Sequence, residues 1–148
     1  MNAGSHELED DVVKGWYGLG SKGRSENMTR WIVIGLAALL GAWMTFDGSR
    51  ALIVGDYVTP SSGPYAGQLG PWAKLVQKVG LDPRGTPVKV AMALIGAAWL
   101  IATMGALLSA EWAGAALVVI AAASLWYLPF GTLIAMVEIL LLLLLRPL

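Results

Sequence analysis

The chain has 148 residues, of which 57% are hydrophobic and only 14% are charged, whereas about 25% of the residues in a typical soluble domain are charged. Ten basic residues balance ten acidic residues, so there is no net positive field to attract a nucleic acid. The lack of cysteine excludes disulfides, thiolate zinc sites and iron–sulfur ligation by these residues. This composition indicates an integral membrane protein.

Residues 1–27 form a polar segment that lacks the basic start and apolar core of a signal peptide. Ser5 can cap a short helix, and the acidic residues after it suit the first turn of that helix. Glycines at positions 15, 18, 20 and 23 are expected to end the helix. A free segment of this composition would be disordered. We expect that it becomes ordered by docking on a partner protein.

The first apolar run covers residues 31–46, between Arg30 and Asp47. It is shorter than the roughly 20 residues of a membrane-spanning helix. The long side chain of Arg30 can reach toward the lipid headgroups, which brings the few residues before it into the span. The pattern therefore predicts a first membrane helix over about residues 28–46.

Residues 47–87 contain seven glycines and five prolines, which predicts a long connecting loop. Inside this loop, one helical face carries Trp72, Leu75, Val76 and Val79, while lysine and glutamine residues fall elsewhere. The spacing predicts a short amphipathic helix. Two positions for it are equally compatible with the pattern, one at the membrane interface and one on a partner protein.

The tract of residues 88–128 carries almost no charge. As one helix it would be about 60 Å long, twice the roughly 30 Å thickness of a hydrocarbon core, so the chain must turn. The polar break at 109–111 predicts two helices, over about 88–108 and 112–128. A proline and a glycine permit the next reversal, and a last helix is expected over 130–145.

The expected fold is an all-α integral membrane protein in which residues 28–148 form one four-helix domain. Five basic residues fall on the terminal side of the predicted spans and five on the loop side, so the positive-inside rule does not decide the orientation. Because Arg30 abuts the first span, we expect both termini in the cytoplasm of a bacterial inner membrane. Aromatic anchors at the membrane interface are expected at Trp31, Trp72, Trp112, Trp126 and Tyr127.

Small residues are expected to hold the helices together, because in lipid the packing of two apolar helices depends on close backbone approach. Ala98, Ala102 and Ala106 fall four residues apart and form one such stripe. Alanine is also simply a good helix former. The stripe is therefore compatible with a packing surface and with ordinary helix composition.

Glu138 is an acid in the middle of the last apolar run, where a charged carboxylate costs about 2.5–3.5 kcal/mol on insertion scales. No basic side chain lies at its depth in the predicted spans, so we expect the protonated acid. We predict that Glu138 accepts a hydrogen bond from Trp99 or Thr103, which lie at a similar depth; Ser124 and Thr45 are less well placed. A structural bond is the favoured interpretation, and a proton or ion relay is the alternative.

The sequence contains no nucleophile elbow, Walker loop or HExxH motif. An Asp47–Arg50 pair is interpreted as a surface salt bridge rather than as a catalytic pair. The single histidine, His6, lies in the polar segment, and no predicted span contains His, Cys or Asp. We therefore expect no metal site and no cofactor held through His or Cys, whereas contact with lipid or pigment stays open.

These observations favour a non-catalytic accessory subunit of a larger membrane complex, such as a respiratory or photosynthetic electron-transfer assembly. Its expected partners are other integral-membrane subunits and membrane lipids, with no nucleic acid and no small-molecule substrate. The alternative is a small homo-oligomeric ion or proton transporter or channel that uses Glu138. A membrane enzyme that acts on lipid through Asp47, Asp56 and Asp82 is the least favoured hypothesis.

Overall fold

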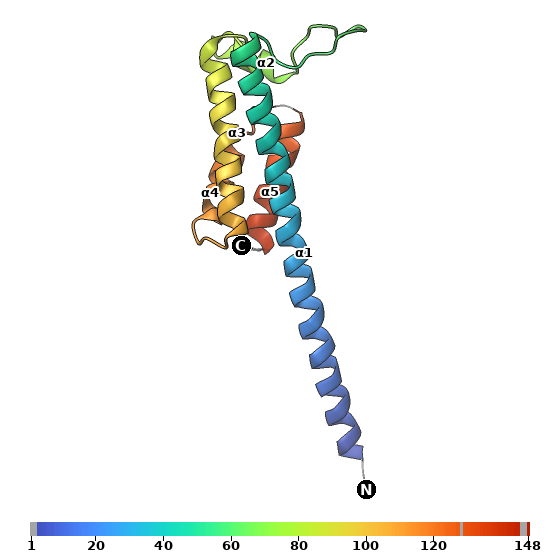
Figure 1. Cartoon of the computed structure of the whole chain (residues 1–148). Helices are drawn as coiled ribbons and strands as arrows, with labels where there is room; N and C mark the ends of the chain where they lie inside the picture. Colours follow the sequence, from blue (N-terminus) through green and yellow to red (C-terminus); the bar gives the residue numbers. More distant parts are fainter. Residues whose placement is uncertain (1–2, 128, 146–147) are drawn as a thin grey trace.

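The computed structural model describes residues 3–127, 129–145 and 148, and for residues 3–26 and 145 it describes the backbone alone. These residues form five helices and no strand, which confirms the all-α prediction. The helices are α1 (Ala3–Val54), α2 (Trp72–Lys78), α3 (Thr86–Leu107), α4 (Ala113–Ala123) and α5 (Phe130–Leu145). Figure 1 shows α1 and α3 side by side along the bundle, with the C-terminus at the end from which α1 projects.

The helix α1 is one continuous helix of 52 residues, about 78 Å long at 1.5 Å per residue. By length and composition, its segment Asn27–Val54 can cross a membrane. The prediction that four glycines end a short N-terminal helix is wrong, because α1 continues through all of them. Glycine costs a helix only about 1 kcal/mol relative to alanine, and α1 contains no proline, which would be a stronger stop. Ser5, the predicted cap, falls inside α1, and its side chain is outside the described part.

The first apolar helix also ends later than the sequence predicts, at Val54 instead of residue 46. Asp47 lies inside α1 and is only 3% exposed. Its carboxylate accepts a hydrogen bond from the backbone N–H of Val58 over 2.7 Å, so the loop folds back over the last turns of the helix. Because this bond satisfies the Asp47 carboxylate, α1 can continue past the acid that ends the apolar run in the sequence.

The helix α3 confirms the predicted helix over 88–108 within two residues and can also cross a membrane by length and composition. It ends in a tight turn in which Ser109 has a positive φ of 56°. The N–H of Ser109 bonds to the carbonyl of Ala106, and the N–H of Ala110 bonds to that of Gly105. Arg30 of α1 donates to the Ala106 carbonyl over 2.8 Å and to the Ser109 hydroxyl over 2.7 Å. The polar break predicted at 109–111 is therefore a real helix end.

The helices α4 and α5 are shorter apolar helices of 11 and 16 residues, about 17 and 24 Å long. Both are shorter than a hydrocarbon core of roughly 30 Å. The helix α5 has the bounds predicted for the last helix, but α4 ends at Ala123 and not near 128, a residue outside the described part. The next residue, Ser124, donates its hydroxyl to the carbonyl of Ile120 over 2.8 Å.

Glycines set the closest approach between α1 and α3. A Cβ added at Gly41 would lie 2.7 Å from the Cβ of Trp99, and one at Gly48 would lie 2.6 Å from the backbone nitrogen of Ala93. The two glycines are seven residues apart and therefore share one face of α1. This close approach is the packing mode that small residues permit between helices in lipid.

The alanine stripe of α3 has a smaller part in this packing than the sequence suggests. Ala102 and Ala106 are each 1% exposed, whereas Ala98 is only half-buried. The helices α1 and α4 pack against α3, and α5 packs against α4 and α1. The four apolar helices thus form a ring in which α3 and α5 lie on opposite sides.

The short helix α2 confirms the amphipathic helix predicted within the loop. Its buried residues are Trp72, Ala73 and Val76, whereas Val79 lies just after the helix and is 70% exposed. The helix packs on this chain's own bundle through Trp72. The buried face is therefore narrower than the predicted one.

Candidate functional site

Glu138 is fully buried, with 0% exposure, and its carboxyl group lies beside the backbone of Ala37 in α1. Neither carboxyl oxygen has a hydrogen-bond partner within the described part of the chain. The predicted bond to Trp99 or Thr103 is absent. The Trp99 indole N–H donates to the Ser124 hydroxyl over 2.9 Å, and the Thr103 hydroxyl donates to the Trp99 carbonyl over 2.7 Å.

The prediction for Glu138 failed because depth alone does not fix the face of a helix. The helix α5 packs on α4 and α1, while α3 packs on α1 and α4. Trp99 points to the end of α4, where Ser124 lies, and not across the bundle to α5. Glu138 is consequently a buried acid that faces α1.

An aromatic cluster joins α2 to the turn between α4 and α5. It consists of Tyr57, Trp72, Trp126 and Tyr127. The Trp72 ring lies 5.2 Å from the Tyr57 ring and 5.8 Å from the Trp126 ring, both edge to face. Such pairs contribute about 0.5–1.5 kcal/mol beyond the burial of their area. The cluster thus fixes α2 and the loop onto the end of the short helices.

The five expected aromatic anchors differ in exposure. Trp72 and Tyr127 are 5% and 8% exposed, so their rings contact protein rather than open surface. Trp31 and Trp112 keep exposed rings at 63% and 52%, and Trp126 is half-buried in the aromatic cluster. An interfacial role for these residues stays a prediction.

Basic side chains hold the loop after α1 against the ends of α1 and α3. Arg50 donates to the backbone carbonyl of Asp56 over 2.7 Å, and Lys89 donates to the carbonyl of Gly55 over 2.6 Å. Arg84 forms a salt bridge with the Asp56 carboxylate over 2.9 Å, and the Arg84 hydrogen bond holds the pKa of Asp56 below its usual range. Arg50 thus bonds the loop backbone, as Asp47 does, and the predicted Asp47–Arg50 salt bridge does not form.

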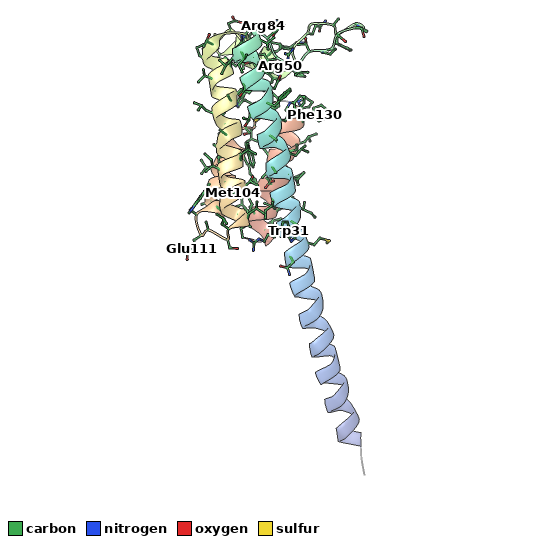
Figure 2. All side chains as sticks on the ribbon, in the orientation of Figure 1. Trp31, Arg50, Arg84, Met104, Glu111 and Phe130 are labelled. Atoms are coloured by element: carbon green, nitrogen blue, oxygen red, sulfur yellow. The ribbon has the colours of Figure 1, made fainter. Side chains whose placement is uncertain are left out.

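A pocket of about 570 Å³ opens between α1, this loop, α2 and the turn before α5. Its aromatic lining consists of Trp43, Tyr57, Trp72, Tyr127 and Phe130. Among the described residues that line it, Asp47 is the only charged one. Figure 2 shows Phe130 at the side of the bundle, below Arg50. Since Phe130 and Ile134 line the pocket together with residues of α1, it lies beneath the loop, between α1 and the first turns of α5.

Two of the residues that line this pocket, Tyr57 and Tyr127, carry hydroxyl groups. Tyr57 is 2% exposed, and its hydroxyl has no hydrogen-bond partner in the described structure. Burial raises the pKa of Tyr57, and the nearby negative charge of Asp47 adds to this effect, so the phenol is a protonated donor at neutral pH. The Tyr127 hydroxyl accepts from the Trp43 indole N–H over 3.0 Å.

The sequence pattern does not indicate that Trp43, Tyr57 and Phe130 belong to one site. Tyr57 lies in a glycine- and proline-rich loop that carries no periodic pattern, so its burial could not be read from spacing.

The structure offers no arrangement for metal binding in the residues it describes, where no cluster of three acid or imidazole side chains occurs. The three aspartates considered for lipid chemistry are each engaged by the backbone or by a basic side chain. Asp47 accepts from the N–H of Val58, Asp56 pairs with Arg84, and Asp82 accepts from the backbone N–H of Arg84 over 3.0 Å. Their contacts are those of loop fixation.

No protein-family model, curated protein or solved structure matches this chain. Its function is therefore inferred from the contacts of its own residues.

Proposed function

We propose that this chain is a non-catalytic accessory subunit of a larger integral-membrane complex, for which a respiratory or photosynthetic electron-transfer assembly is a suitable host. The observation that supports the proposal is the projection of α1 beyond the bundle. Figure 1 shows no other part of the described chain beside residues 3–26. Most helices owe their stability to tertiary packing, and the glycines in this segment weaken it further. A second subunit packed along residues 3–26 would supply the contacts.

The short helices support the same proposal. At about 17 and 24 Å, α4 and α5 leave part of a roughly 30 Å hydrocarbon core uncovered. In the proposed topology all four apolar helices lie in the membrane, with the aromatic cluster and α2 extending the short pair on the loop side. Other membrane subunits and lipids cover the exposed apolar faces. Both termini lie on one side, which we assign to the cytoplasm of a bacterial inner membrane.

Native electrophoresis of mild-detergent extracts from the chain's own host tests this proposal. The full-length chain is compared with a variant that lacks residues 3–26, and Tyr65→Ala is the control, because Tyr65 is exposed in the loop at the opposite end of the bundle. We expect the full-length chain and the control to migrate with a fixed set of membrane subunits in stoichiometric amounts. The shortened chain should keep its bundle and migrate alone. A full-length chain that migrates alone at its natural level would contradict the proposal.

A second candidate function, a homo-oligomeric proton or ion transporter or channel, is favoured by Glu138. An acid within an apolar helix is costly, and this carboxyl group has no partner in the described chain. A pathway that uses it would run between α5 and Ala37 of α1. The test is flux across liposomes that contain the purified chain alone. Flux that Glu138→Gln abolishes would support this function, and inert liposomes would contradict it.

A further inference from the structure

The pocket beneath the loop has the size of a small-molecule site. Its volume of about 570 Å³ lies within the range of roughly 300–1,000 Å³ that is typical of ligand sites. Trp72 and Tyr57 are almost fully buried behind it, whereas Leu39 and Phe130 at its edge are 62% and 75% exposed. The pocket therefore combines a buried aromatic wall with an exposed, apolar mouth.

Tyr57, on the buried side of the pocket, carries a hydrogen-bond donor that no described residue uses. The Tyr57 hydroxyl is buried and unpartnered in the described structure, which is an unfavourable state for a polar group. Its neighbour Tyr127 differs, because the Tyr127 oxygen accepts from the Trp43 indole. A ligand oxygen that accepts a hydrogen bond would satisfy Tyr57 without displacing any contact within the described chain.

The charges around the pocket select against an anionic ligand. No lysine, arginine or histidine is among the described residues that line it, and the only charged lining residue is Asp47. The nearby guanidinium groups of Arg50 and Arg84 are bound to loop groups. A phosphate or carboxylate headgroup would thus meet an acid and no counter-ion. The Asp47 carboxylate already accepts the Val58 N–H, so the loop backbone supplies the donor that this acid needs.

We propose that this pocket binds an uncharged, lipid-soluble molecule whose carbonyl oxygen accepts a hydrogen bond from Tyr57. The apolar body of the molecule contacts the aromatic wall formed with Trp72, and its hydrocarbon tail leaves through the mouth between α1 and Phe130. Two kinds of molecule share this chemistry: quinones with an alkyl tail, and neutral acylglycerols with an ester carbonyl. The site belongs to the bundle itself and does not depend on the role proposed for residues 3–26.

Ligand-dependent thermal unfolding of the purified full chain in dodecyl maltoside tests this proposal, because this detergent has no carbonyl group. The probes are decylubiquinone and 1,2-dioctanoylglycerol. A ligand that binds only the folded chain raises the unfolding midpoint with its concentration, and the shift yields an apparent Kd. We expect a saturable rise with at least one probe. Saturation by the quinone alone, or by the acylglycerol alone, identifies the source of the carbonyl.

The discriminating variant is Tyr57→Phe, which removes the donor and keeps the ring. We expect binding to weaken about tenfold, equivalent to about 1.4 kcal/mol, while the ligand-free chain keeps or raises its unfolding midpoint because an unpartnered hydroxyl is gone. The matched control is Tyr65→Phe, since Tyr65 is 69% exposed and does not line the pocket. It should leave both quantities unchanged.

Several results would overturn the proposal. Decylbenzene, which has the tail and ring but no carbonyl, should not match the probes, and equal binding would show that Tyr57 is irrelevant. Stronger binding of laurate or of decyltrimethylammonium would show that the pocket prefers a charged ligand. Unchanged affinity in Tyr57→Phe, or a clearly lower midpoint of its ligand-free form, would show that the hydroxyl serves another contact. Absence of a saturable shift with either probe would also contradict the inference.

Discussion

The two long helices and the two short helices of the bundle are held together by different means. The helices α1 and α3 meet backbone to backbone at Gly41 and Gly48, and Arg30 of α1 bonds the end of α3. The helices α4 and α5 depend on the aromatic cluster at one end, and they bury Glu138, an acid with no hydrogen-bond partner among the described residues, near α1. The long pair is thus closely packed. In the short pair, we expect the loss of an aromatic side chain to lower stability and the replacement of Glu138 by an apolar residue to raise it.

The difference in length between the two pairs of helices also explains where the pocket lies. The pocket lies where the short helices stop and the loop with α2 fills the remaining height of the bundle (Figures 1 and 2). No equivalent space is available between α1 and α3, because a single added Cβ at Gly48 would already clash with Ala93. A ligand site in this fold therefore arises from the mismatch in helix length.

Replacement of Trp72 by alanine should have the largest effect on stability. The ring is 5% exposed and contacts three other aromatic rings, and truncation of a buried tryptophan costs about 3–5 kcal/mol. We expect the loss to be local: amide hydrogen exchange should accelerate in the loop, in α2 and in the turn before α5, while α1 and α3 stay protected. Uniform acceleration throughout the bundle would mean that α1 and α3 depend on the aromatic cluster as much as α4 and α5 do.

Gly48→Leu should disrupt the long pair instead. The new side chain would meet the backbone of Ala93, and overpacking of this kind costs about 1–3 kcal/mol. The matched control is Gly35→Leu on the same helix, because nothing lies within 4 Å of a Cβ at Gly35. Thermal unfolding should show a lower midpoint for Gly48→Leu and an unchanged or higher midpoint for Gly35→Leu. Equal midpoints for both variants would exclude close packing at Gly48.

Glu138→Leu should stabilise the short pair, by about 1 kcal/mol. A buried polar group without a partner is a cost that an apolar residue of similar size removes, and both carboxyl oxygens lack a partner in the described chain. Chemical denaturation in detergent measures the change, with Glu138→Gln as the variant that keeps a polar side chain. A lower free energy of unfolding in Glu138→Leu would show that the acid has a partner, supplied by another copy or another subunit.

Hydrophobic length predicted the helices well, because the apolar tracts of α3 and α5 begin and end at glycine, proline or polar residues. It predicted the extent of α1 poorly, since glycine weakens a helix without ending it. Whether Trp99 can reach Glu138 depends on which face of α3 turns toward α1. In α3 the residue that marks this face is Gly96, which lies against Thr45 of α1, and the regular alanine spacing does not single it out. Tyr57 could not be placed because a loop position has no period, and its burial depends on contacts with three other segments.

The smallest predicted effect concerns pH and the loop over the pocket. The hydrogen bond from Arg84 lowers the pKa of Asp56 below its ordinary value of 3.8. A carboxyl group with a lowered folded-state pKa contributes stability above its unfolded pKa and loses it as pH falls through the lower value. We therefore expect the loop to stay fixed at neutral pH and to loosen below about pH 4. The pair is nearly half exposed, so solvent limits the effect to a small change. Hydrogen exchange of the loop amides between pH 3 and pH 6, corrected for intrinsic rates, measures it. Asp56→Asn is the control and should remove the part of the pH dependence that the Asp56–Arg84 pair contributes. A loop whose protection does not change over this range in the unmodified chain would show that Arg50 and Lys89, which bind backbone carbonyls, suffice to hold it.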